Sequence, residues 1–373
     1  MSKEYTSLGL MSGTSGDGID ASIITTDGIT KYEVVLDKYY EYDNRIFQKI
    51  HQLKEKIQNY EDLIKLKKEC NELEKNITLF HAKIINDIIK KKQFEIVGFH
   101  GQTIFHNSEK KISKQLGDGN LLFQLIKKKI VFNFRQNDIK CGGEGAPLSP
   151  IFHQLIAKKL NLDVPAIILN IGGISNITLI NSKNNIHELK SKDIGPGNCL
   201  IDKWIRNKSE FKFDKDGTIA KKGNINELII EQAQEFFSNS NINKNFSLDT
   251  NDYDISFVRG LSVEDGAATL TNLTAKIIGV ALSNISFLTK KKKYDVLLSG
   301  GGRKNSYLIS KIKENITKEL SLSPIDIYGI DGDFIESQAF AFLAVRSFLN
   351  LPISFPGTTG CNGPTTGGEL IKC

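Results

Sequence analysis

The sequence predicts an α/β protein built from two domains, and three observations lead to this prediction. The chain has 373 residues, which is long for one hydrophobic core. Short apolar segments with strand character alternate with longer segments of helical periodicity. Glycine-rich turns follow several strand-like segments, and two such turns, in LGLMSGTSGDGIDASII and IILNIGGISNITLI, are flanked by strand-like segments on both sides.

The expected elements of the first half begin with two strand-like segments on either side of the glycine turn at residues 13–18. Residues 44–92 carry apolar side chains at helical spacing. Strands are expected at 95–99 and 130–134, because the short apolar runs there end in the polar stretches HGQT and RQND.

The second half repeats this alternation of strands and helices. Strands are expected at 166–170 and 177–180, around the stretch IGGISN, and at 295–298, before the stretch SGGGRKN. Helical periodicity is expected over three segments, at 265–288, 306–319 and 333–349.

The composition excludes several classes of protein. Hydrophobic residues make up 40% of the chain and charged residues 25%, as in ordinary globular proteins. We expect no signal peptide, because no apolar segment follows a basic start at the N-terminus. We expect no membrane span, because no apolar run reaches the roughly 18 residues that a span needs. The five cysteines are scattered without CxxC spacing, which argues against a disulfide framework and against a zinc site. Unpaired cysteines suit a reducing compartment, the cytoplasm.

The net charge of +6 comes with lysine runs at 90–92, 127–129 and 290–293. Nucleic-acid binding would require aromatic stacking residues or a recognition motif beside such runs, and neither is present. We therefore expect the lysines to lie on solvated helix ends.

The first glycine turn suits an anion. Glycines let the backbone approach a ligand and direct several N–H groups to one point, and Thr14 and Ser15 add hydroxyl donors. Asp17 would repel phosphate unless a cation lay between them, and Mg²⁺ on a nucleotide supplies that cation. An ordinary hairpin with an Asp-Gly turn is the alternative.

Known phosphate motifs do not describe these turns. A Walker A loop needs a lysine and a following helix, and a dinucleotide fingerprint needs a spacing that SGGGRKNSYL lacks. Two strand–turn–strand loops and one strand–turn–helix loop together resemble the actin-like ATPases and sugar kinases. This resemblance implies a ribonuclease H-like fold with a nucleotide cleft between two lobes, at 1–138 with 352–373 and at 139–351.

A more specific resemblance runs nearly end to end. The stretches GLMSGTSGDGID, HGQT, GGEGAPLSPIFH, LNIGGISNIT, DIGPGNCLIDKWI, DKDGT, SGGGRKN and ESQAFAFLAVRSFLNLP occur in one order. In this the chain resembles the anhydro-N-acetylmuramic acid kinase family. The resemblance implies a cytoplasmic enzyme of peptidoglycan recycling that opens 1,6-anhydro-N-acetylmuramic acid with water and phosphorylates O6 with Mg·ATP. The products would be ADP and N-acetylmuramic acid 6-phosphate.

The resemblance also implies site residues. ATP would be bound by the two hairpins and by a third glycine loop, with Asp17 as a magnesium contact. These residues are Gly13, Thr14, Ser15, Gly16, Asp17, Gly18, Ile19 and Asp20, then Gly172, Gly173 and Asn176, and then Gly300, Gly301 and Gly302.

Two carboxylates are the expected catalytic residues. By resemblance, Asp193 is the general base for the attacking water and Glu336 orients the sugar. From the residues alone, Asp193 could instead form an Asx turn with the Gly-Pro-Gly that follows it. Asn198 would then be the N-cap of the helix CLIDKWIR. Glu336 could instead close a capping box with Asp333.

The expected sugar contacts are His100, Gly101, Gln102, Arg135, Gly197 and Asn198. The first three follow a buried strand, where open α/β sheets bind ligands, and Arg135 could pair with the lactyl carboxylate. His100 as a core histidine and Arg135 paired with Asp138 are the alternatives. DKDG at 214–217 lacks the later ligands of a calcium loop, so a turn is expected there.

Two positions depart from the family pattern, and two other functions stay open. Gly16 stands where leucine is usual and Glu144 where glutamine is usual.

A kinase acting on an ordinary sugar hydroxyl or carboxylate is one alternative, and an inactive sugar-sensing regulator is another. No helix-turn-helix pattern precedes residue 9, which counts against a regulator. A homodimer is compatible with the sequence.

Overall fold

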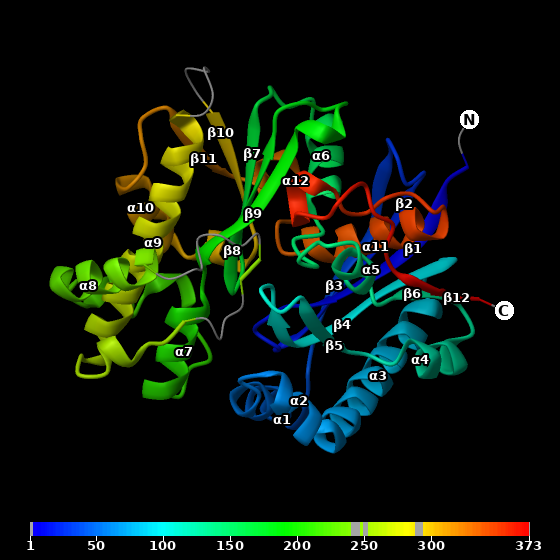
Figure 1. Ribbon diagram of the computed structural model, residues 1–373, viewed down its shortest axis with the longest axis horizontal. Helices are drawn as coiled ribbons and strands as arrows, with labels where there is room; N and C mark the ends of the chain where they lie inside the picture. Colours follow the sequence, from blue (N-terminus) through cyan, green and yellow to red (C-terminus); the bar gives the residue numbers. More distant parts are fainter. Residues whose placement is uncertain (1–2, 240–246, 249–252, 288–293, 373) are drawn as a thin grey trace. The chain divides into compact units, whose positions relative to one another are not determined.

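The computed structural model describes residues 3–239, 247–248, 253–287 and 294–372. The chain divides into two compact units, each containing one sheet (Figure 1). The first unit comprises Met1–Leu162, Ser182–Lys190 and Asp333–Cys373, and the second comprises Asp163–Asn181 and Ser191–Gly332.

The first unit contains a seven-stranded sheet of order β12-β6-β4-β1-β2-β3, with β5 paired to β4. Strand β1 runs antiparallel to β2 and parallel to β4, and β4 runs parallel to β6. The strands are β1 (Tyr5–Ser12), β2 (Gly18–Thr26), β3 (Tyr32–Glu41), β4 (Ile96–Asn107), β5 (Ile112–Leu116), β6 (Lys129–Phe132) and β12 (Glu369–Ile371).

Helix α11 lies against this sheet. A side chain at Gly9 of β1 would overlap the backbone of Ser337, and one at Gly98 of β4 would overlap that of Phe340, so both glycines permit close packing. The helices of the unit are α1 (Asn44–Lys56), α2 (Tyr60–Lys65), α3 (Lys67–Ile89), α4 (Gly119–Ile126), α5 (Gln136–Lys140), α6 (Pro150–Lys159), α11 (Ile335–Phe348) and α12 (Pro356–Thr359), with the 3-10 helix η1 (Ile186–Glu188).

The second unit contains a five-stranded sheet of order β11-β10-β7-β8-β9. Strand β7 runs antiparallel to β8 and parallel to β10, and β10 runs parallel to β11. The strands are β7 (Ala166–Ile171), β8 (Ile174–Ile180), β9 (Leu189–Pro196), β10 (Tyr294–Ser299) and β11 (Leu320–Pro324). The helices are α7 (Cys199–Lys208), α8 (Glu227–Asn239), α9 (Val263–Phe287) and α10 (Ser306–Glu314), with 3-10 turns η2 (Lys215–Gly217), η3 (Ala220–Lys222), η6 (Ser256–Val258), η7 (Gly301–Lys304) and η8 (Ile325–Tyr328).

The two sheets share one topology. In each, the first strand lies between the second and the fourth, the third lies outside the second, and the first two strands form an antiparallel hairpin. The repeated strand order agrees with what the resemblance to the actin-like ATPases and sugar kinases implied. The predicted α/β fold class is confirmed.

Several predicted elements differ from the structure in extent. The stretch HGQT, expected after a strand, lies inside β4, because residues 102–107 pair with β5. The helix expected at 306–319 ends at Glu314, and Leu320 then begins β11. The lysine run at 290–293 lies outside the described residues.

The predicted lobe boundaries also differ from the compact units. The sequence assigned 139–351 to the second lobe, whereas α6 and α11 belong to the first unit, with α11 packed on its sheet. The lobe boundaries stay a prediction. None of the described helices is long and apolar enough to cross a membrane.

Candidate functional site

The first glycine turn joins β1 to β2 in the first unit. Gly16 has φ of +62° and its N–H donates to the Gly13 carbonyl at 3.1 Å, which closes a tight turn. A left-handed backbone favours glycine, so the departure from leucine at this position suits the turn. Thr14 and Ser15 at its tip are exposed, as a phosphate-binding turn requires.

Gln102 supports this turn from β4. Its Oε1 accepts a hydrogen bond from Ser12 Oγ at 2.6 Å, and its Nε2 donates to the Gly13 carbonyl at 3.0 Å. The Gln102 side chain is fully buried, so it positions the turn. The resemblance implied a sugar contact for Gln102, and that role stays a prediction.

The charges around the turn have opposite signs. Ser15 Oγ donates to the Asp17 carboxylate at 2.6 Å, and Lys54 Nζ of α1 donates to the Thr14 carbonyl at 2.7 Å. Burial raises the pKa of the Tyr39 hydroxyl, and the Asp17 carboxylate raises it further. A cation and a carboxylate therefore both lie beside the exposed tip of the turn.

The remaining predicted residues of this hairpin have mixed surroundings. Ile19 is fully buried in the core of the first unit, so only its backbone could contact a nucleotide. A Cβ on Gly18 would lie 2.5 Å from Tyr39 Oη, which explains a glycine there by close packing. Asp20 is half-buried on β2, opposite Met11 and Tyr39.

A second group of polar residues in the first unit is centred on Arg135. Its guanidinium lies 2.9 Å from His100 Nε2 and donates to the Gly145 carbonyl at 2.8 Å. Burial and the adjacent Arg135 hold the pKa of His100 well below its usual value, so the ring is neutral. Its Nε2 then accepts from Arg135, and its Nδ1 donates to the Gly101 carbonyl at 2.8 Å.

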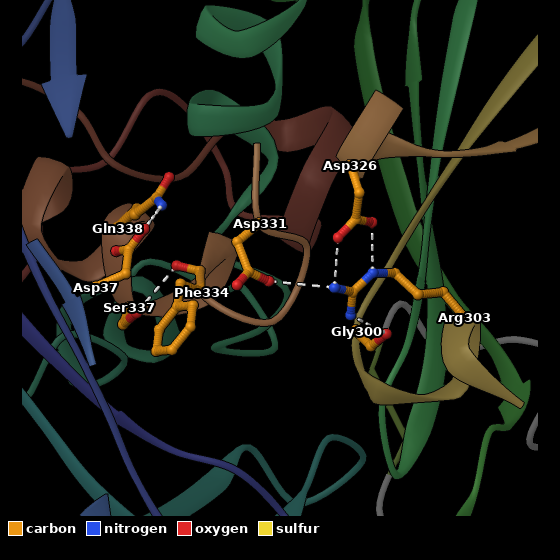
Figure 2. Close-up of polar contacts among 8 residues, drawn as sticks. All are labelled: Asp37, Gly300, Arg303, Asp326, Asp331, Phe334, Ser337 and Gln338. Atoms are coloured by element: carbon orange, nitrogen blue, oxygen red, sulfur yellow. Dashed lines mark hydrogen bonds and ion pairs between the residues drawn. The ribbon is translucent and has the colours of Figure 1, made fainter. Parts of the chain in front are cut away.

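Glu336 belongs to the same group. Burial raises the pKa of its carboxyl group, while the positive charge of Arg135 opposes this shift. The capping-box alternative for Glu336 is wrong, because the N-cap of α11 is Phe334, whose carbonyl accepts from Ser337 Oγ at 2.9 Å (Figure 2). Glu336 therefore has no capping function.

The pairing of Arg135 with Asp138 is also wrong. The buried Asp138 carboxylate accepts from the Gly145 N–H at 2.7 Å and from Thr359 Oγ1 at 2.7 Å. These bonds fix the loop that follows α5. In the same loop the Glu144 N–H donates to the Thr359 carbonyl at 2.9 Å.

The second glycine turn joins β7 to β8 in the second unit. The Gly173 carbonyl accepts from the Gly197 N–H at 2.8 Å, and the Gly172 carbonyl accepts from the Asn198 N–H at 2.8 Å. A Cβ on Gly197 would overlap the Gly172 carbonyl oxygen, so only glycine allows this approach. Asn198 is the N-cap residue of α7, but its side chain makes no capping bond and donates to Gly172 at 3.1 Å.

The third glycine loop follows β10 in the same unit. Gly300 has φ of +77° and lies against Asn170 and Ile171, and Gly301 faces open space. Arg303 anchors the loop: it donates to both Asp326 oxygens, at 2.7 and 2.8 Å, to Asp331 at 3.2 Å and to the Gly300 carbonyl at 3.0 Å (Figure 2). The hydrogen bond from Arg303 is the main cause of the lowered pKa of Asp326.

Asp193 lies on β9 in the second unit and is half-buried. The Leu248 N–H donates to its Oδ2 at 2.8 Å, which orients the carboxylate. The DKDG stretch is the expected turn, because the buried Asp214 carboxylate accepts from the Ile219 and Ala220 N–H groups at 2.8 and 2.9 Å.

The residues present are compatible with ATP and magnesium. A Cβ at Gly13 would meet no atom closer than Ser15 Oγ at 3.8 Å, and Asn176 Oδ1 is buried without a hydrogen-bond partner among the described residues. These features leave room and a free polar atom beside the two turns. No group of three His, Cys, Asp or Glu among the described residues could bind a metal, but Mg²⁺ on a nucleotide needs only one or two protein carboxylates.

Sequence reasoning missed three residues that shape these turns: Ser12, Lys54 and Arg303. Ser12 and Gln102 are 90 positions apart and Arg303 and Asp326 are 23 apart, so no local spacing reveals either pair. In the sequence, Lys54 is one of many charged residues in the helical segment at 44–92. Its position beside Thr14 depends on how α1 packs, which no local pattern reveals.

Comparisons with known proteins identify the family. Residues 5–372 match the model of a protein family described as "Anhydro-N-acetylmuramic acid kinase". The protein of that name from Pelagibacter ubique (strain HTCC1062) is 52% identical, with all of both chains covered. Those from Zymomonas mobilis and Agrobacterium fabrum are 35% and 36% identical, covering 97% and 100% of this chain and 98% and 100% of their own. The chain belongs to the anhydro-N-acetylmuramic acid kinase family.

Proposed function

We propose a division of roles for this kinase, which opens 1,6-anhydro-N-acetylmuramic acid with water and transfers the γ-phosphoryl group of ATP to O6. One observation carries the nucleotide part. The first hairpin of each sheet bears a glycine turn at the same topological position, after the first strand. We assign both turns to the phosphates of ATP and the loop at Gly300–Gly302 to its nucleoside.

The chemistry requires a base and a phosphate acceptor. Asp193 takes a proton from the water that attacks C1, the C1–O6 bond breaks, and O6 forms its new bond to the γ-phosphorus as ADP leaves. A positioned general base typically contributes about 10²–10⁴-fold to a rate. Bound Mg²⁺ would neutralise phosphate charge, with Asp17 as its protein contact.

The sugar would be recognised by the group centred on Arg135. The guanidinium already donates to neutral His100, so its orientation is set before a ligand arrives. A guanidinium suits the lactyl carboxylate, and Glu336 suits a sugar hydroxyl. We place Gly101, Gly197 and Asn198 in the sugar site as well, and we expect the enzyme to act in the cytoplasm.

Product analysis by mass tests this proposal. With ATP, Mg²⁺ and 1,6-anhydro-N-acetylmuramic acid, the sugar should gain one water and one phosphoryl group. Phosphorylation without uptake of water would favour an ordinary sugar kinase, and no turnover would favour a regulator. Gel filtration with light scattering would separately establish whether the enzyme is a homodimer.

Replacing Asp17 with asparagine should raise the Mg²⁺ concentration needed for half-maximal activity. We expect a shift of about tenfold, because even groups outside the first coordination shell change metal affinity by about 10- to 100-fold. The measurement is a Mg²⁺ titration at fixed ATP. Asp87→Asn, an exposed change on α3, serves as control. An unchanged titration for Asp17→Asn would remove this residue from the metal site.

Replacing Lys54 with glutamine should raise the KM for ATP while leaving kcat nearly unchanged. The ammonium group lies beside the exposed tip of the first turn, and an exposed charge pair contributes about 0.2–1 kcal/mol, which predicts about a 1.4- to fivefold effect. Lys56→Gln on the same helix is the matched control. The difference between the two variants should shrink in high salt. Equal KM values would exclude a role for Lys54 in phosphate binding.

A further inference from the structure

A pocket lies at the end of the first sheet away from the proposed site residues. Strands β1, β4 and β6 run parallel. Ser12 is the last residue of β1, Arg135 follows β6, and His100 of β4 lies between the residues that pair with Leu10 and Ser12 at the carboxyl end of β1. The pocket is at their amino ends, and its volume is about 570 Å³. Ligand sites typically have volumes of about 300–1,000 Å³, so a small molecule would fit.

Four lysines line this pocket, and we call it the lysine pocket. Lys127 and Lys128 follow α4, Lys129 begins β6, and Lys372 follows β12. These three elements contact one another in the first unit (Figure 1). The lining also contains one carboxylate, Glu95, so the pocket has a net charge of about +3 from these groups.

The positive charge of the lysine pocket exceeds its negative charge, and no ion pair among the described residues neutralises it. None of the four ammonium groups forms an ion pair with a described carboxylate, in contrast to Lys114, which lies 3.0 Å from Glu74. Like charges that gather without counter-charges raise the local concentration of anions. The sequence predicted solvated helix ends for Lys127–Lys129, whereas the structure places this run around a concave surface.

Aromatic rings lie close to two of the ammonium groups. Lys128 Nζ lies 5.8 Å from the ring centre of the buried Phe94, and Lys127 Nζ lies 5.8 Å from that of Phe123. Both distances fall within the range of cation–π interactions. Lys127 also has φ of +52° at the C-cap of α4, where glycine is usual. The chain thus tolerates an unfavourable backbone conformation to place a lysine there.

We propose that the lysine pocket binds a phosphorylated small molecule. Ammonium groups bind phosphate oxygens by charge-assisted hydrogen bonds, and Thr6 adds a hydroxyl group to the lining. The half-buried Phe123 ring adds apolar surface to the lining, which suits a sugar or a nucleobase. A phosphate ester of either kind combines the charge and the apolar surface that the pocket presents.

Isothermal titration calorimetry of the whole protein tests this inference. The three probes are pyrophosphate, N-acetylmuramic acid 6-phosphate and ADP. The double variant Lys128→Gln/Lys129→Gln should lose about tenfold or more in affinity for one of the two organic phosphates, since hydrogen bonds to charged groups are among the stronger ones. The control Lys67→Gln/Lys68→Gln removes the same charge from exposed positions of α3, and it should bind the three probes with the affinities of the unaltered protein.

The three probes distinguish the sources of the phosphate. A loss confined to the sugar phosphate identifies the reaction product as the ligand, a loss confined to ADP identifies a nucleotide, and a loss for all three identifies the phosphate group itself. Binding at the catalytic residues persists in both double variants and cancels in the comparison. Identical isotherms for the two double variants, with both folded by circular dichroism, would overturn the proposal whatever reaction the enzyme catalyses.

Discussion

Replacing Asp193 with asparagine is expected to abolish turnover while leaving ATP binding nearly unchanged. Asparagine keeps the shape of aspartate and can still accept the hydrogen bond from the Leu248 N–H, so β9 should keep its structure. It cannot take the proton of the attacking water, and the loss of a general base typically costs about 10²–10⁴-fold in rate. ADP release gives kcat, and calorimetry with ATP gives the binding constant.

The control for this variant is Asp295→Asn, an exposed position on β10 of the same unit. It should retain the kcat of the unaltered enzyme. A kcat for Asp193→Asn above about a tenth of that value would argue against the role of general base, because it would fall short of the usual range. Loss of ATP binding together with turnover would instead indicate a damaged nucleotide site.

Replacing Gly197 with alanine is expected to weaken ATP use and to lower the stability of the second unit. The added methyl group would overlap the Gly172 carbonyl oxygen and would lie 3.0 Å from Ser175 Oγ. The second glycine turn must then move, or its bond from the Gly197 N–H must lengthen. Such overpacking typically costs about 1–3 kcal/mol, and each 1.4 kcal/mol is about tenfold in an equilibrium constant.

Thermal unfolding and the KM for ATP measure the two effects of Gly197→Ala. Gly260→Ala provides the control, because no atom lies within 4 Å of the added Cβ there. A Gly197→Ala variant with the melting temperature and KM of this control would show that the close approach to the second turn is unimportant.

The chemistry of the turns could be read from the sequence because it depends on neighbouring residues. Glycines, hydroxyl side chains and flanking β-branched residues within a few positions determine a hairpin with exposed donors. The same holds for the helices at 44–92, whose apolar spacing is a local property. The paired glycine hairpins also indicated the repeated topology that the two sheets confirm.

Contacts between distant segments required the tertiary structure. Gln102 beneath the first turn, Lys54 beside it and Arg303 behind the third loop each depend on strands or helices far apart in the chain. The pairing of Arg135 with Asp138 was wrong for this reason, because Thr359, far along the chain, donates to the Asp138 carboxylate. The capping box at Glu336 was wrong for a local reason: the N-cap of α11 is Phe334, one residue after Asp333.

The sequence by itself therefore determined the fold class, the two glycine hairpins and the family of this protein. The tertiary structure alone decided which side chains support the turns and where the lysine run at 127–129 lies. The physical reason is that backbone preferences and apolar periodicity act over a few residues, whereas burial and hydrogen bonding select partners by packing, across any separation in the chain.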